Sequence, residues 1–200
     1  MNSLAAVILA AGQSKRMGQP KMLLPWGGTT VIGRVIATFA EASLNEIVIV
    51  TGGAREAVER ETERLGREYP VRCVHNPQYE SGEMLSSLQA GLLSLGTQFE
   101  AALIGLGDQP QLSLAAVHKV ISANEANTAQ LIVPSYNMRR GHPWLVNRFF
   151  WPALFALKSP QTLRDFLNTF STKILYVESD QTILKDLDTP EDYLKEKPCI

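Results

Sequence analysis

The sequence predicts an α/β protein in which helices cover both faces of a mostly parallel sheet. Two observations carry this prediction. Short, fully apolar runs recur as far as residue 136, which is typical of strands buried on both faces. Segments with apolar residues at helical spacing separate these runs, and such alternation is the pattern of βαβ units. With 200 residues, 45% of them hydrophobic, we expect one domain over residues 1–200 with a sizeable core.

The expected elements alternate strictly in the first part of the chain. The predicted strands span residues 4–10, 46–52, 71–76, 101–108 and 129–136, and the predicted helices span residues 29–42, 54–69, 83–95 and 112–124. Thr29 or Thr30 can cap the first helix, because a threonine side chain accepts a hydrogen bond from the free amides of a first turn.

After residue 137 the alternation loosens. A further strand is predicted over residues 172–178, and further helices are predicted over residues 159–170 and 189–197. Ser159 is the expected N-cap of the first of these helices, with Pro160 in its first turn. Thr189 is the expected N-cap of the second, with Pro190 at its first position.

The composition excludes several classes of protein. A net charge of −1 gives no general attraction to nucleic acid or to a membrane surface, so any attraction for anions must be local. Cys73 and Cys199 form no disulfide framework, and we expect both to be reduced thiols of a cytoplasmic protein. The apolar run over residues 4–11 is too short to cross a membrane and follows no basic segment of a signal peptide.

The loop after the first strand, in the stretch LAAGQSKRMGQPKMLLP, is rich in glycine and basic residues. Gly12 and Gly18 allow backbone N–H groups to turn toward an anion, and Lys15, Arg16 and Lys21 would neutralise its charge. This composition favours a compact polyanion such as a polyphosphate. The spacing fits neither a Walker A loop nor a dinucleotide fingerprint, and a merely solvated basic loop remains the alternative.

Acidic residues at two places are candidates to hold a metal ion beside this loop. Asp108 follows the strand predicted in IGLGDQP, while Asp186 and Asp188 precede the terminal helix. The carboxyl ends of parallel strands meet at one edge of a sheet, so we expect Asp108 near the first loop. Mg²⁺ prefers oxygen ligands and commonly bridges one or two carboxylates to substrate phosphates. Taken singly, each aspartate could instead belong to a turn or a helix cap.

Five stretches, taken in order, resemble the MobA-like NTP transferases. They are LAAGQSKRMGQPKMLLP, NPQYESGEMLSSLQAGL, GLGDQP, RRGHP and DLDTPEDY, and the resemblance runs from residue 4 to about residue 194. Within this family the sequence is most similar to molybdenum cofactor cytidylyltransferases. The resemblance implies a Rossmann-like, three-layer α/β/α nucleotidyltransferase fold, an NTP substrate and Mg²⁺ as cofactor.

The resemblance also implies which residues contact the phosphates and the metal. Nucleotidyl transfer to an anionic phosphate needs positioning and charge neutralisation rather than a protein nucleophile. Arg16, Lys21 and Asp108 are the implied catalytic residues. Asp108 and Asp188 are the implied metal ligands, and Asp186 is the alternative to Asp188.

At the base, the resemblance implies a pyrimidine nucleotide. Guanylyl-transferring relatives usually read LAGG in the first loop, whereas a Cβ at Ala11 restricts the space beside the base. GDQP, where guanylyl enzymes tend to have GDMP, favours CTP as well. Ser87 matches the segment that approaches the base, with Ser86 as the alternative. The implied nucleotide-binding residues are Ala10, Ala11, Gly12, Gly18, Gly82 and Ser87.

The implied reaction is transfer of CMP from CTP to the terminal phosphate of molybdopterin, with release of pyrophosphate. A molybdenum hydroxylase is the implied recipient of the product. Guanylyl transfer to molybdopterin, transfer to a sugar phosphate, and non-catalytic carriage of the cofactor are the alternatives. Arg139, Arg140 and His142, in RRGHP, are candidates to contact the acceptor's phosphate or pterin.

Overall fold

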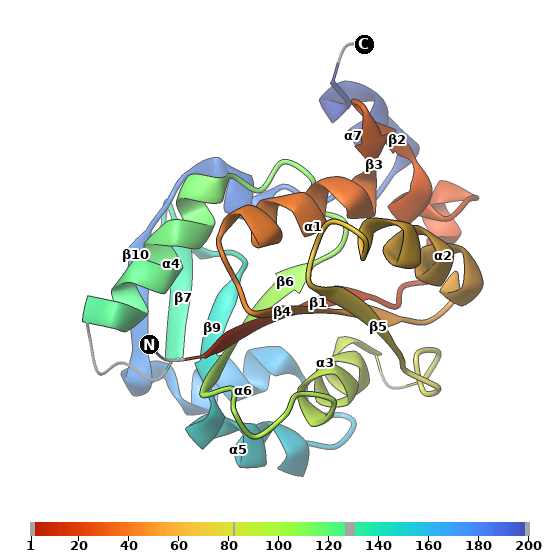
Figure 1. The fold of residues 1–200 in the computed structure, drawn as a ribbon. Coiled ribbons are helices and arrows are strands. Elements are labelled where there is room, and N and C mark those ends of the chain that lie inside the picture. The colour runs from red at the N-terminus through yellow and green to blue at the C-terminus, as the bar shows by residue number, and fades with distance from the viewer. Residues whose placement is uncertain (1–2, 82, 127–130, 199–200) are drawn as a thin grey trace.

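In the computed structural model, a central sheet lies between two layers of helices, as Figure 1 shows. The structure describes residues 3–81, 83–126 and 131–198. Among these residues the sheet has eight strands, in the order β10-β7-β9-β6-β1-β4-β5, with β8 paired to β7. The predicted α/β fold, with its Rossmann-like three layers and mostly parallel sheet, is confirmed.

The strands of the first part of the chain form the parallel half of the sheet. β1 lies in the middle, with β4 and β6 parallel on its two sides, and β5 extends the sheet beyond β4. All seven residues of β1 are buried, which explains its fully apolar sequence. The parallel strands are β1 (Leu4–Ala10), β4 (Glu46–Thr51), β5 (Val71–His75) and β6 (Ala101–Leu106).

The other half of the sheet contains an antiparallel strand that the sequence pattern did not predict. β9 (Trp144–Asn147) pairs antiparallel with both β6 and β7. It therefore begins at the edge of the sheet where β6 ends, with Trp144 opposite Ile104. The remaining strands are β7 (Leu131–Tyr136), β8 (Arg139–Arg140), β10 (Ile174–Glu178) and a separate hairpin of β2 (Pro25–Trp26) and β3 (Thr29–Thr30).

Two hydrophobic clusters hold the helices on opposite faces of the sheet (Figure 1). One face carries α1 (Val31–Glu41), α2 (Arg55–Leu65) and α4 (Leu114–Ala126). The other face carries α3 (Glu83–Leu93), α5 (Trp151–Ala156) and α6 (Leu163–Thr169). α7 (Pro190–Glu196) packs near the β2–β3 hairpin, where Leu187 and Tyr193 contact a third cluster.

Short 3-10 helices occur in the connections. They are η1 (Lys15–Met17), η2 (Lys21–Leu23), η3 (Arg148–Phe150), η4 (Ser171–Lys173) and η5 (Gln181–Leu184). Among the described residues, no helix combines the length and the apolar character that a membrane crossing requires.

Local capping explains where several helices begin. The Thr30 side chain accepts a hydrogen bond from the Gly33 amide at 3.0 Å, so Thr30 caps α1. Thr189 caps α7 as predicted. The prediction that Ser159 caps α6 was wrong. Thr162 caps this helix instead, because its side chain and that of Asp165 satisfy each other's backbone amides in a capping box.

The order of the strands creates a switch point beside β1. The chain runs from β1 outward through β4 to β5, and then returns to β6 on the other side of β1. In open α/β sheets, ligands bind outside the carboxyl ends of the strands at such a point. The loops that follow β1 and β6 are therefore the first place to look for a site.

Candidate active site

A buried side chain anchors the loop after β1, and the Lys15 and Arg16 side chains of this loop are exposed. Met17 is buried in the third cluster, whereas Arg16 beside it is exposed. Gly18 has a φ of 65°, a backbone conformation that favours glycine. The Lys21 amide donates to the Ser14 hydroxyl at 3.2 Å. The loop thus holds Arg16 and Lys21 in defined positions at the edge of the sheet.

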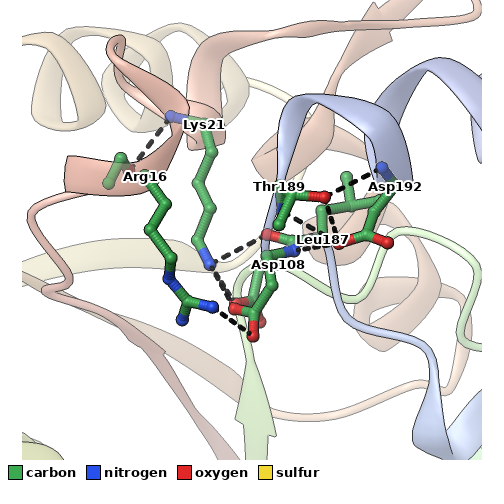
Figure 2. Close-up of polar contacts among 8 residues, drawn as sticks. Arg16, Lys21, Asp108, Leu187, Thr189 and Asp192 are labelled. Atoms are coloured by element: carbon green, nitrogen blue, oxygen red, sulfur yellow. Dashed lines mark hydrogen bonds and ion pairs between the residues drawn. The ribbon is translucent and has the colours of Figure 1, made fainter.

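Four charged side chains meet at this edge, and we refer to Arg16, Lys21, Asp108 and Asp188 as the charge cluster. The Lys21 ammonium donates to Asp108 Oδ2 and lies 3.9 Å from Asp188 Oδ1. Arg16 Nη1 lies 3.2 Å from Asp188 Oδ2. Figure 2 shows the Lys21 side chain reaching from its loop to Asp108 and to the Leu187 carbonyl. Cations and carboxylates therefore alternate across the space between the first loop and the sheet.

Lys21 and Asp108, the inner pair of the charge cluster, are nearly enclosed. Arg16 and Asp188, the outer pair, are open to solvent. The side chains of Lys21 and Asp108 are 12% and 16% exposed, against 68% for Arg16 and 42% for Asp188. Contacts between charges strengthen as water is excluded, so the inner pair is the stronger one.

Asp188 enters the charge cluster because the chain returns to the sheet edge just before α7. The Leu187 amide donates to the Asp108 carbonyl at 3.0 Å, and the Leu187 side chain is buried. The Asp188 amide donates to Asp192 Oδ2 at 3.3 Å, so its backbone takes part in the cap of α7. Its carboxylate points instead to Arg16 and Lys21. The capping interpretation thus holds for the backbone of Asp188 but not for its side chain.

Asp186 lies near the charge cluster, yet it forms no ion pair among the described residues. Partial desolvation raises the pKa of its carboxyl above the usual range, and the negative charges of Asp108 and Asp188 raise it further. Of the two candidates before α7, the structure therefore brings Asp188 to the cations.

A cavity of about 360 Å³ opens beside the charge cluster. It is lined by residues 12–17 and by Lys21, Tyr79, Glu80 and Asp188. Lys15, Arg16 and Lys21 line it together with two carboxylates, so positive charge exceeds negative charge in its lining. A compact polyanion fits this combination of size and charge.

The carboxylates of the charge cluster fit a divalent cation only if a substrate completes the coordination. Among the described residues, no group of three or more histidine, cysteine, aspartate or glutamate side chains could hold a metal ion. Asp108 and Asp188, however, both approach the single Lys21 ammonium. Two converging carboxylates are what Mg²⁺ uses when phosphate oxygens and waters supply its other ligands.

The serines expected near the base belong to a buried network that the sequence reasoning missed. Asn76, which follows β5 and is 2% exposed, donates from Nδ2 to Ser86 Oγ at 2.8 Å and to Ser87 Oγ at 3.0 Å. Its Oδ1 accepts from the Gln78 amide at 2.9 Å. The position of Asn76 at the end of a predicted strand was the sequence signal that could have identified it. Gly82, the other residue expected here, lies outside the described residues.

The alanines expected beside the base lie where β1 passes into the first loop. Ala10 and Ala11 are both buried, and the Ala11 carbonyl accepts from the Gly53 amide at 3.2 Å. A Cβ added at Gly52 would lie 2.3 Å from that carbonyl oxygen. The loop after β1 and the loop after β4 are thus in tight backbone contact, which only a residue without a side chain allows at position 52.

A second, larger cavity of about 810 Å³ lies where β8 and β9 meet α3 and α6. His142 and Trp144 stack at its wall, with ring centroids 4.6 Å apart. Desolvation lowers the pKa of His142 to about 4, so its imidazole is neutral at pH 7, and its Nε2 has no hydrogen-bond partner among the described residues. Arg139 and Arg140 also line this cavity.

This larger cavity is linked to the charge cluster through the connection before α7. The Ile183 carbonyl accepts from the His142 amide at 3.1 Å and from the Gln109 side chain at 3.4 Å. Gln109 follows Asp108 directly. The structure thus brings RRGHP and GLGDQP, two of the stretches singled out in the sequence, to one region of the sheet edge.

In a comparison with known protein families, residues 6–174 match the MobA-like NTP transferase domain. The chain is 32% identical over 200 residues to the molybdenum cofactor cytidylyltransferase of Escherichia coli K12, covering 98% of this chain and 97% of that protein. It is 33% identical over 197 residues to the nicotine blue oxidoreductase of Paenarthrobacter nicotinovorans, covering 94% and 93%.

Solved structures give the same fold. The crystal structure of Rv0371c from Mycobacterium tuberculosis H37Rv superposes with a TM-score of 0.82 at 26% identity, covering 97% of each chain. A further crystal structure of that protein, a complex with manganese, superposes with a TM-score of 0.78 at 25% identity, again over 97% of each chain.

Proposed function

This chain belongs to the MobA-like NTP transferase family, and on that premise we propose that it transfers CMP from CTP to the terminal phosphate of a molybdopterin-type acceptor. The family makes it a nucleotidyltransferase. The observation that carries the finer proposal is the charge cluster at the wall of a cationic cavity. We include in the proposal a cytoplasmic location and a molybdenum hydroxylase as the recipient of the product.

The proposed reaction needs no protein nucleophile. An oxygen of the acceptor phosphate attacks the α-phosphorus of CTP, and the bond from that phosphorus to the β-phosphate oxygen breaks, so pyrophosphate leaves. Because the attacking oxygen is already anionic, no general base has to take a proton. What remains is to hold two anions together in line, which is a task for fixed positive charge.

Each member of the charge cluster has a part in this task. Arg16 and Lys21 would bind the β- and γ-phosphates and stabilise the negative charge of the leaving pyrophosphate. Asp108 and Asp188 would hold Mg²⁺, which when bound supplies positive charge at the phosphate being transferred. The manganese complex of the structural relative supports a divalent cation in this family.

The two sequence relatives belong by name to different reaction classes at nearly equal identity, so identity does not choose between them. The charge cluster favours nucleotidyl transfer. Two converging carboxylates beside three cations suit a complex of a metal ion with a triphosphate.

The larger cavity is the proposed acceptor site. The stacked rings of His142 and Trp144 offer an aromatic wall to a planar pterin, and Arg139 and Arg140 offer positive charge to its phosphate. Arg164 lines the cavity as well, so the neutral His142 avoids adding a fourth positive charge there at pH 7.

The decisive experiment is a panel of CTP, GTP, ATP and UTP with Mg²⁺, each with and without molybdopterin, scored by pyrophosphate release and by the mass of the product. We expect release with CTP that depends on the acceptor. A preference for GTP would replace the cytidylyl proposal by the guanylyl one. Binding of molybdopterin without pyrophosphate release from any NTP would overturn the enzymatic proposal in favour of a carrier.

A further inference from the structure

The Lys21 ammonium takes the place between the carboxylates where a divalent cation would bind. It donates to Asp108 Oδ2 and to the Leu187 carbonyl at 3.1 Å, and it lies 3.9 Å from Asp188 Oδ1. An ammonium group has three donors, and these contacts use two of them while the third side faces Asp188. Lys21 therefore supplies the positive charge that balances the inner carboxylate, Asp108.

The charge cluster is balanced in this arrangement. Arg16 and Lys21 contribute two positive charges, and Asp108 and Asp188 contribute two negative charges. Mg²⁺ binds oxygen at about 2.0–2.1 Å, so a cation on Asp108 Oδ2 would meet the Lys21 ammonium that contacts the same oxygen. Since the inner pair is only 12% and 16% exposed, water screens this repulsion poorly. Lys21 and a metal ion thus compete for one carboxylate.

A polyanion in the neighbouring cavity would resolve the competition. Lys21 and Asp188 both line that cavity, together with the exposed Arg16. The lysine side chain is a point charge on a flexible four-carbon stem, so its ammonium can turn from a carboxylate to a phosphate by rotation about its own bonds. Arg16 can turn in the same way from Asp188. The carboxylates would then be free for the cation that accompanies the phosphates.

We propose that Lys21 is an internal counter-ion that keeps the Asp108–Asp188 pair closed to divalent cations until a polyphosphate in the adjacent cavity draws its ammonium away. This inference rests on the metal role assigned to the two aspartates under the proposed function. It makes metal and nucleotide binding positively coupled, and by linkage each must increase the affinity for the other by the same factor.

Binding of Mn²⁺ alone tests the inference directly. The free ion is measured by electron paramagnetic resonance in the absence of any nucleotide. We expect weak binding to the wild-type protein and binding about fivefold tighter or more to Lys21→Met. Lys21→Arg, which keeps a cation, should stay as weak as the wild type. Lys15→Met is the matched control, because Lys15 lines the same cavity but forms no ion pair among the described residues.

The ion must also bind at the assigned carboxylates. Adding Asp108→Asn to Lys21→Met should abolish the gain in Mn²⁺ affinity. If Lys21→Met does not fold, as judged by its thermal transition, Lys21→Gln replaces it. The wild type supplies an independent measurement: its affinity for a non-hydrolysable CTP analogue should rise at least about fivefold when Mn²⁺ replaces a chelator, and this ratio should shrink in the lysine variant.

Two results would overturn the inference: Mn²⁺ affinity that is unchanged in both neutral lysine variants, or Mn²⁺ binding to the wild type that is indifferent to the analogue. Neither measurement requires an acceptor or turnover. If the nucleotide panel shows no transfer while the lysine variant binds Mn²⁺ more tightly, the proposed function is wrong and the counter-ion role of Lys21 is supported. If transfer occurs and the Mn²⁺ affinities of wild type and variant do not differ, only the counter-ion role is wrong.

Discussion

Lys21 and Asp108 are 87 positions apart in the sequence, and their charged groups are in direct contact at the carboxyl edge of the sheet. The contact joins the loop after β1 to the loop after β6, on the two sides of the topological switch point. It therefore ties the candidate phosphate loop to the candidate metal site.

Replacing Asp108 by asparagine should lower the turnover number by about two to three orders of magnitude, because one electrostatic partner of the transition state is lost. The measurement is pyrophosphate release at saturating CTP and Mg²⁺. Glu125→Gln, a carboxylate-to-amide change at an exposed position of α4, is the control and should keep full activity. Near-native turnover of the Asp108 variant would contradict its assignment.

Replacing Thr189 by alanine should loosen Asp188 as well as α7. Loss of an N-cap costs about 1 kcal/mol of stability, and here the cap also fixes the turn from which the Asp188 carboxylate projects. We expect a higher KM for CTP at limiting Mg²⁺. Thr162→Ala removes the same kind of capping box from α6. Thr162 lines the larger cavity and not the one beside the charge cluster, so at saturating acceptor this variant should cost similar stability while leaving the KM for CTP unchanged. Equal KM values for CTP in the two variants would show that Asp188 does not contribute to nucleotide binding.

His142 should make the protein less stable in mild acid. Its pKa is lowered to about 4 in the folded state by desolvation, against an ordinary value of 6.5. Well above pH 6.5 neither state binds the proton. As the pH falls from 6.5 toward 4, the unfolded chain binds a proton that the folded protein does not, so about 3 kcal/mol of stability is lost.

Urea unfolding at pH 7.5 and pH 4.5 measures this loss. His142→Phe, which keeps an aromatic ring against Trp144, should reduce the difference between the two pH values. His118→Gln, at an exposed position of α4, should leave the difference as it is in the wild type. The same loss in all three proteins would show that His142 is not its source.

Replacing Gly52 by alanine should disturb the base end of the site. The new Cβ would lie 2.3 Å from the Ala11 carbonyl oxygen, so backbone must shift, at a cost of about 1–3 kcal/mol. We expect weaker binding of CTP in equilibrium titrations. Gly28→Ala is the control, because a Cβ there meets nothing within 4 Å and its φ is not positive. Unchanged CTP affinity in the Gly52 variant would mean that the base does not contact this loop.

Much of the fold was predictable from the sequence, because apolar runs within single elements indicate buried parallel strands. The position of Asp108 beside the first loop was predictable too, because the carboxyl ends of parallel strands meet at one edge of the sheet. β9 was missed because it has only four residues and lies in the stretch HPWLVNRFFWPAL, where proline and aromatic residues surround it without any alternation.

Tertiary contacts decided what the sequence left open. Asp186 and Asp188 both precede α7, and only the pairing of Leu187 with the Asp108 carbonyl shows which of them reaches the cations. The start of α6 was misplaced because Ser159 and Thr162 are equally good caps by type, and the reciprocal bond with Asp165 selects Thr162. Several assignments stay predictions: the extent of a single domain, the catalytic and metal-binding roles of the charge cluster, and the roles toward a nucleotide of Ala10, Ala11, Gly12, Gly18, Gly82 and Ser87.

The bond between the Lys21 ammonium and the Leu187 carbonyl spans 166 positions of the chain. During synthesis on a ribosome, the basic loop emerges early. Its second carboxylate partner, Asp188, is added only after nearly all the other described residues. A nascent chain can therefore expose the cationic loop before the charge cluster is complete. The cluster assembles only after the segment before α7 has been synthesised and reaches the sheet.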